Sequence, residues 1–330
     1  MGLVFKTFVA FVLTFINAFT LPIFGHFAGA GSFGAEDPDT VKLNFAAISD
    51  IHMTDEYARR KVLECGLWDM ENANEPLDAL VLAGDLTDHG LEEEYENLKK
   101  AFSGYTPAKE IIMAVGNHDT WTDDDDRYEP AKEYFVKYSE EITGRQLEDC
   151  YFTTEINGYT FIVMASEGTS TSAYISDTQL KWLRNEMDKA SEKGLPIFVI
   201  SHWPIAETHG LPETWGDDEP ELLDGSFGNQ NYEVEAILKD YENVFMITGH
   251  IHNGFVNDRQ KDYYGYASVE SYGSFHSINL SSFMYLVPRG RVANGTGYCI
   301  EVYDDEVLIR ARSFTAGVWY TDYDVTIPLV

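Results

Sequence analysis

The sequence predicts an α/β fold in which two sheets form an α-β-β-α sandwich, with a functional site at the carboxyl ends of the strands. Two observations support this prediction. From about residue 41 to residue 252, short apolar segments alternate with segments of helical periodicity, and a polar cluster follows each apolar segment. After about residue 262, Tyr, Ser, Val and Gly dominate, and the pattern becomes typical of antiparallel strands and hairpins. We expect this later region to supply the second sheet of a single domain spanning residues 41–330.

The first half of the chain contains three predicted strands joined by two helices. The strands are the apolar segments 43–49, 79–83 and 111–115. Residues 57–70 and 91–102 place apolar side chains at helical spacing. In open α/β folds, ligand sites lie at the carboxyl ends of the strands. The polar residues that follow these three strands are therefore candidate functional residues.

The second half repeats this alternation. Strands are predicted over residues 159–165, 197–200 and 244–247, and a helix over residues 232–241. Another helix begins near Ser176 and Gln179, which have the spacing of a capping box, and Gly194 is placed to end it. Residues 298–303 and 307–314 alternate as antiparallel strands do.

The composition excludes one class of partner. The chain has 330 residues, 44% of them hydrophobic, and a formal net charge of −32. Such a charge repels nucleic-acid backbones, and no Lys/Arg cluster overrides it locally. We therefore expect no nucleic-acid partner, and we interpret the charge as a solubility feature of an exported protein. Cys65, Cys150 and Cys299 form no CxxC, so we expect buried thiols rather than a disulfide.

The amino-terminal segment indicates export. Residues 1–24 carry one charge, Lys6, and a long apolar run. Small residues follow at 28–31 and fit an A-x-A cleavage site. We predict a signal peptide over residues 1–30, cleaved after Ala30, and an extracellular, cell-surface or periplasmic protein. The alternative is an uncleaved membrane anchor over residues 7–24, because the run is long enough. The sequence gives no oligomeric state.

Five polar clusters follow predicted strands and contain residues that bind hard or borderline metals through O or N. They are Asp50-x-His52, Gly84-Asp85, Gly116-Asn117-His118-Asp119, His202 and Gly249-His250-x-His252. Any one of them alone would be interpreted as a cap or a surface feature. Together they contain five of the nine histidines, and strand ends of one sheet converge on one edge. We therefore expect these residues to meet in space.

In their order, these clusters resemble the calcineurin-like metallophosphoesterase superfamily, whose pattern is DxH, GDxxD, GNHD/E, H and GHxH. The resemblance covers residues 50–252 and implies two divalent or trivalent metal ions, of Fe, Mn, Zn or Ni. It implies that the first metal is held by Asp50, His52 and His252. It implies that the second metal is held by Asn117, His202 and His250. Asp85 would bridge both, since each carboxylate oxygen can donate to one cation.

The same resemblance assigns catalytic roles. His118 would face the substrate, and Asp119 would orient His118 through a hydrogen bond. Gly84, Gly116 and Gly249 would let the backbone turn tightly beneath the metals. Two cations about 3.5–4 Å apart lower the pKa of a shared water. The bridging hydroxide would attack phosphorus while the metals and His118 stabilise the phosphoryl oxygens.

Two departures from the pattern argue against particular subfamilies. Ser/Thr phosphatases of this fold carry Arg at the position of His89, and its absence argues against that activity. Purple acid phosphatases carry a metal-bound Tyr at the position of Asp88, so we do not expect this chain to be one of them. The chain looks closest to the bacterial phosphodiesterase-like branch, which includes cyclic-nucleotide and glycerophosphodiester hydrolases. We expect hydrolysis of a small phosphodiester. The alternatives are a phosphomonoesterase of the same mechanism, a nuclease, which the acidic charge disfavours, and a non-catalytic scaffold, which the complete ligand set disfavours.

The sequence does not identify the substrate. Residues 120–158 and 203–231 lie between the motifs and are expected to wall the pocket. Their candidates for stacking on a base or sugar are Trp121, Tyr128, Trp203, His209 and Trp215. Packing in the core or in a loop is an equal alternative for each of them. The acidic run 123–126 is expected to be a solvated loop, because it lacks the spaced ligands of a calcium loop.

Overall fold

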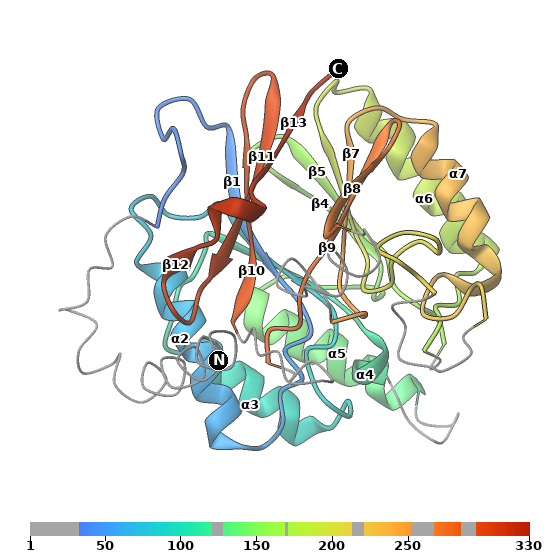
Figure 1. Cartoon of the computed structure of the whole chain (residues 1–330). Coiled ribbons are helices and arrows are strands. Elements are labelled where there is room, and N and C mark those ends of the chain that lie inside the picture. Colours follow the sequence, from blue (N-terminus) through green and yellow to red (C-terminus); the bar gives the residue numbers. More distant parts are fainter. Residues whose placement is uncertain (1–32, 121–127, 169–170, 213–220, 253–266, 285–294) are drawn as a thin grey trace, which may run out of the picture.

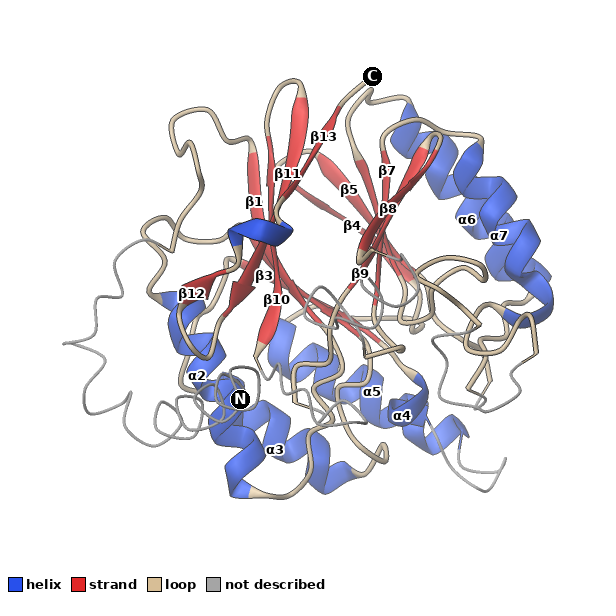
Figure 2. Cartoon of the chain, in the orientation of Figure 1, coloured by secondary structure: helices blue, strands red, loops and turns tan. Residues whose placement is uncertain are grey.

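The computed structural model describes residues 33–120, 128–168, 171–212, 221–252, 267–284 and 295–330. Within these ranges, two sheets pack face to face and helices cover their outer faces (Figures 1 and 2). The predicted α-β-β-α sandwich is confirmed.

The first sheet has the strand order β12-β11-β10-β1-β2-β3, and β13 pairs with β11. One end of this sheet is parallel and consists of β1 (Leu43–Ile48), β2 (Ala79–Ala83) and the edge strand β3 (Glu110–Ala114). On the other side of β1 lie antiparallel strands from the carboxyl-terminal region. They are β10 (Thr296–Val302), β11 (Glu306–Ser313), β12 (Val318–Trp319) and β13 (Val325–Pro328).

The second sheet has the strand order β4-β5-β6-β7-β9-β8. It contains β4 (Phe152–Ile156), β5 (Tyr159–Val163), β6 (Ile197–Ile200), β7 (Val244–Thr248), β8 (Val269–Tyr272) and β9 (Phe275–Asn279). The four strands β5, β6, β7 and β9 are parallel, and the two edge strands are antiparallel to their neighbours.

The prediction that the region after residue 262 supplies the second sheet is wrong, because the strands of that region divide between the two sheets. The second sheet is built mainly from β5, β6 and β7, which are fully buried, as strands of a parallel sheet covered on both faces are. The later strands divide between the sheets. β8 and β9 extend the second sheet, and β10 to β13 extend the first.

Among the described residues, five helices cover the outer faces. The first sheet packs against α2 (Tyr57–Glu71), α3 (Glu92–Phe102) and α5 (Tyr128–Thr143), and the second against α6 (Asp177–Ser191) and α7 (Asn231–Lys239). Shorter elements are α4 (Asn117–Thr120), η2 (Gly228–Gln230) and η4 (Thr321–Tyr323). Helix α6 is capped by the Ser176 hydroxyl, which accepts from the Gln179 backbone N–H at 3.2 Å. The Gln179 amide instead bonds to the Ala165 backbone, so half of the predicted box forms.

Alternating side chains of each strand place one core between the sheets and another under the helices. In β1, Phe45 faces the other sheet and Ile48 faces the helices. The Phe45 ring meets Phe161 and Phe198 edge to face, at centroid distances of 5.3 and 5.0 Å. Removing such a ring costs about 3–5 kcal/mol of stability. This packing fixes the carboxyl ends of both sheets relative to each other.

Several sequence predictions fall on residues outside the described ranges. These are the signal peptide over residues 1–30, the alternative anchor over residues 7–24, Trp121, Trp215 and the acidic run 123–126. Across the ranges that the structure does describe, no helix is both long enough and apolar enough to cross a membrane. The three cysteines are free and buried, as predicted.

Candidate metal centre

The loops that follow five strands bring the seven predicted ligands to one edge of the sandwich. Asp50 and His52 follow β1, Asp85 follows β2, Asn117 follows β3, His202 follows β6, and His250 and His252 follow β7. Parallel strands that end at the same edge cause this convergence. All seven residues are buried or nearly so.

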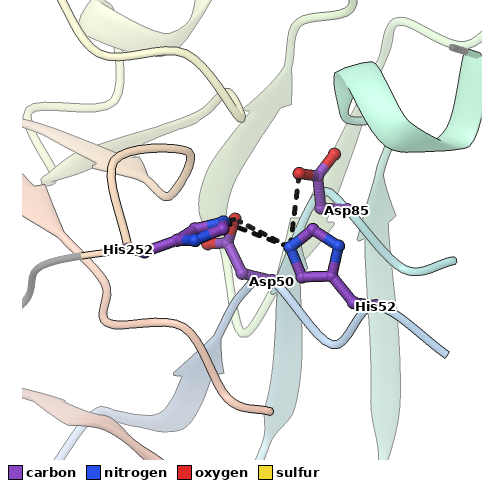
Figure 3. Close-up of side chains that lie close together, drawn as sticks. All are labelled: Asp50, His52, Asp85 and His252. Carbon is purple, nitrogen blue, oxygen red and sulfur yellow. Dashed lines mark hydrogen bonds and ion pairs between the residues drawn. The ribbon is translucent and has the colours of Figure 1, made fainter. Parts of the chain in front are cut away.

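Four of these residues form a first cluster, drawn in Figure 3. The His252 Nε2 atom lies 3.0 Å from Asp50 Oδ1, and the His52 and His252 Nε2 atoms are 3.1 Å apart. The His52 Nε2 atom lies 3.7 Å from Asp85 Oδ2. One potential ligand atom from each residue lies within 4.8 Å of the others, so the four residues could hold a metal ion together.

A second cluster shares Asp85 with the first. The His202 Nε2 atom lies 3.1 Å from Asp85 Oδ2, and the His250 Nδ1 atom lies 3.2 Å from His202 Nε2. Asp85 therefore lies between the two clusters, where a bridging ligand must be.

Asn117 supplies an independent test of whether a metal fits. Its side chain is 3% exposed, and its Oδ1 atom is buried without a hydrogen-bond partner. A buried amide oxygen without a partner is costly, and a cation would satisfy it. The donor set also fits, because carboxylate, amide and imidazole ligands suit Mn, Fe and Zn. The residues present therefore fit a pair of metal ions.

Charges inside the site compensate each other. Burial would raise the pKa of Asp85, but the charge and hydrogen bond of His202 and the charges of His118 and His52 together outweigh it and hold this pKa well below its usual value. Burial also disfavours the charged form of His202 and would lower its pKa, but Asp85 and Asp50 raise this pKa to about 9. Burial and His202 together lower the pKa of His250 well below its usual value. Bound cations would replace the proton on His202 as partners of these carboxylates.

The ligand loops have an unusual backbone. Five of the nine described non-glycine residues with positive φ are predicted ligands, namely Asp50, His52, Asp85, His250 and His252. Asp and His tolerate this region better than most residues, but it is still strained. Neighbouring glycines allow close approach. A Cβ on Gly116 would lie 2.2 Å from Asp85 Oδ1, and one on Gly249 would lie 2.5 Å from Asp50 Oδ2.

His118 is partly exposed, with a side chain that is 18% exposed. Its ring meets the His52 ring edge to face at 4.5 Å. Its Nδ1 atom donates to the Asp88 carbonyl oxygen at 2.8 Å. This bond makes Nε2 the ring atom for exchanging a proton with a substrate.

The hydrogen bond predicted from Asp119 to His118 is replaced by another arrangement. The Asp119 carboxylate accepts from the Gly116 N–H at 2.8 Å, from the Leu86 and Thr87 N–H groups at 3.2 and 2.9 Å, and from the Thr87 hydroxyl at 2.8 Å. These donors surround the carboxylate because Asp119 lies in α4, which turns back over the loop after β2. Asp119 thus holds the Asp85 and Asn117 loops together.

Asp88 is a site residue that sequence reasoning used only as a subfamily marker. Its Oδ1 atom accepts from His52 Nδ1 at 3.1 Å, while its carbonyl accepts from His118. Arg59 donates to the His52 carbonyl and lies 3.9 Å from Asp88 Oδ2. Its position in the sequence was the available signal, because Asp88 follows Asp85, the predicted bridging ligand, by three residues in GDLTDHG.

Two residues considered for stacking on a substrate are packed instead. Trp203 is 1% exposed, lies in the core beneath α6 and α7, and donates from Nε1 to the Thr171 carbonyl at 2.9 Å. His209 is fully buried and contacts Ser277 Oγ at 2.8 Å and the Ala267 carbonyl at 2.9 Å. For Tyr128, the structure describes the backbone of α5 and not the side chain.

Comparison with known proteins agrees with this geometry. Residues 43–254 match the family model of calcineurin-like phosphoesterases. The chain is 25% identical over 235 residues to a 3′,5′-cyclic-nucleotide phosphodiesterase of Nostoc sp., which covers 68% of this chain and 77% of that protein. It is 30% identical over 131 residues to a probable cyclic nucleotide phosphodiesterase of Rhodococcus erythropolis, which covers 39% of each.

A solved structure shares the fold. The crystal structure of a dimetal phosphatase from Danio rerio aligns with a TM-score of 0.56 at 13% identity. The alignment covers 88% of this chain and 100% of that one.

Proposed function

The chain belongs to the calcineurin-like phosphoesterase family, hydrolases of phosphoric ester bonds, and we propose that its substrate is a small phosphodiester. The observation that supports metal-dependent hydrolysis of a phosphoester is the pair of ligand clusters that share Asp85. Cyclic nucleotides are the first class to test, because the relatives from Nostoc and Rhodococcus carry that activity in their names.

The chain's own residues have distinct parts in this chemistry. When bound, the two metal ions would lower the pKa of a shared water and neutralise charge on the phosphoryl oxygens. Asp50, His52 and His252 would hold one ion, and Asn117, His202 and His250 the other, with Asp85 contacting both.

His118 acts on the leaving group in this proposal. The Asp88 carbonyl holds its Nδ1–H, so that Nε2 exchanges the proton. Asp88 also holds His52 through its carboxylate, so one residue sets both the metal ligand and the proton donor.

Charge supports a diester over a monoester. A diester carries one negative charge, whereas a phosphate monoester carries about −1.5 to −2 at pH 7. The chain has a formal net charge of −32, so a substrate with more negative charge meets a stronger repulsion from the protein as it approaches. Salt limits this repulsion to charges within a Debye length of about 8 Å.

The test is a comparison of kcat/KM for bis-aryl phosphate and aryl phosphate with one metal and at one pH, followed by 3′,5′-cyclic nucleotides. We expect the diester to be preferred. The Asp85→Asn variant gives the background rate of the preparation. A clear advantage for the monoester would overturn the diesterase assignment and leave the two-metal chemistry standing.

We also propose that the protein is exported and that its mature chain starts near Gly31. The apolar run and the small residues at 28–31 support this. Phe33 is 3% exposed, and its ring packs against Phe314 and Trp319 at 5.8 and 5.7 Å. Cleavage after Ala30 would thus keep this anchoring residue. Mass spectrometry of protein from the native host tests the proposal, and an intact chain with Met1 in the membrane fraction would support the anchor instead.

A further inference from the structure

The segment 279–284 leaves the second sheet and passes beside the predicted ligand loops. It begins at the end of β9 and precedes β10, and its residues, Asn-Leu-Ser-Ser-Phe-Met, are all buried. None of them belongs to a metal-binding motif. The segment nevertheless contacts two ligand loops that come from different sheets, the Asp50 loop and the Gly249-His250 loop.

Asn279 holds the peptide group between Gly249 and His250. Its Nδ2 donates to the Gly249 carbonyl at 2.6 Å and to Thr248 Oγ1 at 3.1 Å. The N–H of the same peptide group, on His250, points at the Asp50 carboxylate, with distances of 3.2 and 3.3 Å to its two oxygens. The C=O and N–H of a trans peptide point in opposite directions. Asn279 therefore sets the plane that aims this N–H at Asp50.

Ser282 contacts the backbone of Asp50, whereas the His250 N–H contacts its carboxylate. Its hydroxyl donates to the Asp50 carbonyl at 3.2 Å, and the Met284 N–H donates to the same oxygen at 3.3 Å. The Phe283 N–H donates to the Ser49 carbonyl at 2.9 Å. Asp50 has a φ of 54°, a strained value that the surrounding contacts must maintain.

We propose that Asn279 and Ser282 are positioning residues of the metal centre, which fix Asp50 from its two ends. Asn279 acts on the carboxylate through the Gly249-His250 peptide, and Ser282 acts on the backbone. Because the two residues are three apart in one segment, they also fix the distance between the ligand loops of the two sheets. The proposal rests on the metal centre of the proposed function but not on the identity of the substrate.

The expected effect is on metal affinity. Groups that orient metal ligands typically contribute about 10–100-fold to metal affinity or activity. Ser282→Ala and Asn279→Ala should each weaken Mn²⁺ and Zn²⁺ binding by about this factor. The measurement is titration of the metal-free full chain with Mn²⁺ or Zn²⁺ in competition with a chelating dye.

Ser281→Ala is the matched control. Ser281 is the adjacent residue, is 1% exposed, and bonds through its hydroxyl to Thr296 Oγ1 of β10 rather than to either ligand loop. Both serine variants lose one buried hydroxyl, so the metal-free proteins should lose similar thermal stability. Only Ser282→Ala should lose metal affinity, and kcat for bis-aryl phosphate should fall with it while KM stays unchanged.

Two results would overturn the proposal. One is equal metal affinity in wild type, Asn279→Ala and Ser282→Ala. The other is an equal loss in Ser281→Ala and Ser282→Ala, which would show a general packing effect. If Asn279→Ala does not fold, the serine pair decides alone. If no phosphodiester is hydrolysed but metal affinity follows the expected pattern, the diesterase proposal fails and this one stands.

Discussion

The two sheets contribute different chemistry to the same site. The loops after β1, β2 and β3 bring both ligand carboxylates, one amide and one imidazole, whereas the loops after β6 and β7 bring only imidazoles. The first sheet thus carries the fixed negative charge and the second carries donors that are neutral once deprotonated. In the proposed assignment, each metal takes ligands from both sheets. The centre is therefore complete only when the sheets are packed on each other, and four experiments can break or sharpen this contrast.

The largest effect is expected from the carboxylate that both metals share. Asp85→Asn should lose most bound metal, and activity should fall by more than about 10³-fold, beyond the loss of one charge-stabilising group. Elemental analysis and turnover of bis-aryl phosphate measure both quantities.

Asp78→Asn is the control for this substitution. Asp78 is a buried carboxylate that precedes β2 and accepts from Asn44 N–H at 3.0 Å and Lys109 Nζ at 2.8 Å. This variant should lose stability and keep its metals. Active wild-type protein with one metal or none would refute the shared bridge.

A substitution of His118 distinguishes metal binding from proton transfer at the first sheet. His118→Ala should keep its metal content and lose about 10²–10⁴-fold in kcat, with a smaller loss for substrates that have good leaving groups. His89→Ala is the control, since its side chain is 64% exposed and contacts Glu94. A collapse of metal content in His118→Ala would place His118 among the ligands instead.

Metal removal tests whether the ions link the sheets. A ligand that binds only the folded state at 100 times its Kd stabilises the fold by about 2.7 kcal/mol. EDTA should therefore lower the unfolding temperature of the wild type by several degrees and leave that of Asp85→Asn unchanged. An identical melting curve with and without EDTA would contradict ligation from both sheets.

The smallest effect is the pH dependence of metal binding. The pKa of His202 is raised to about 9, so in the metal-free chain its pairing with Asp85 stabilises the fold fully below pH 6.5 and is lost as pH rises through 9. Metal must displace this proton, so affinity should rise with pH over the same window, by up to about tenfold per pH unit for one proton. Calorimetry in buffers of different ionisation enthalpy measures the proton released. Affinity that falls with pH would contradict this assignment.

The apolar pattern and the order of the motifs were sufficient to predict many of the strands and the candidate ligands. They identified the seven residues that the structure brings together, because each follows a strand that its own apolar sequence predicts. They did not show that β10 joins the first sheet beside β1, because alternation in a strand does not specify its partner. Asp88, Asn279 and Ser282 were missed because they act on backbone groups or through another residue. Asp119 was misassigned because three of its four donor groups come from a loop about 30 residues earlier in the chain.

The left-handed backbone at five ligand positions has an evolutionary consequence. A non-glycine residue in this region costs on the order of 1–3 kcal/mol, which native stability must offset. Glycine at these five positions would relieve the strain, but it would also remove a ligand each time. Such a substitution would relieve strain in the metal-free chain but forfeit the stabilisation that bound metal provides, so a directed-evolution screen on this scaffold has to score turnover and melting temperature in the same round.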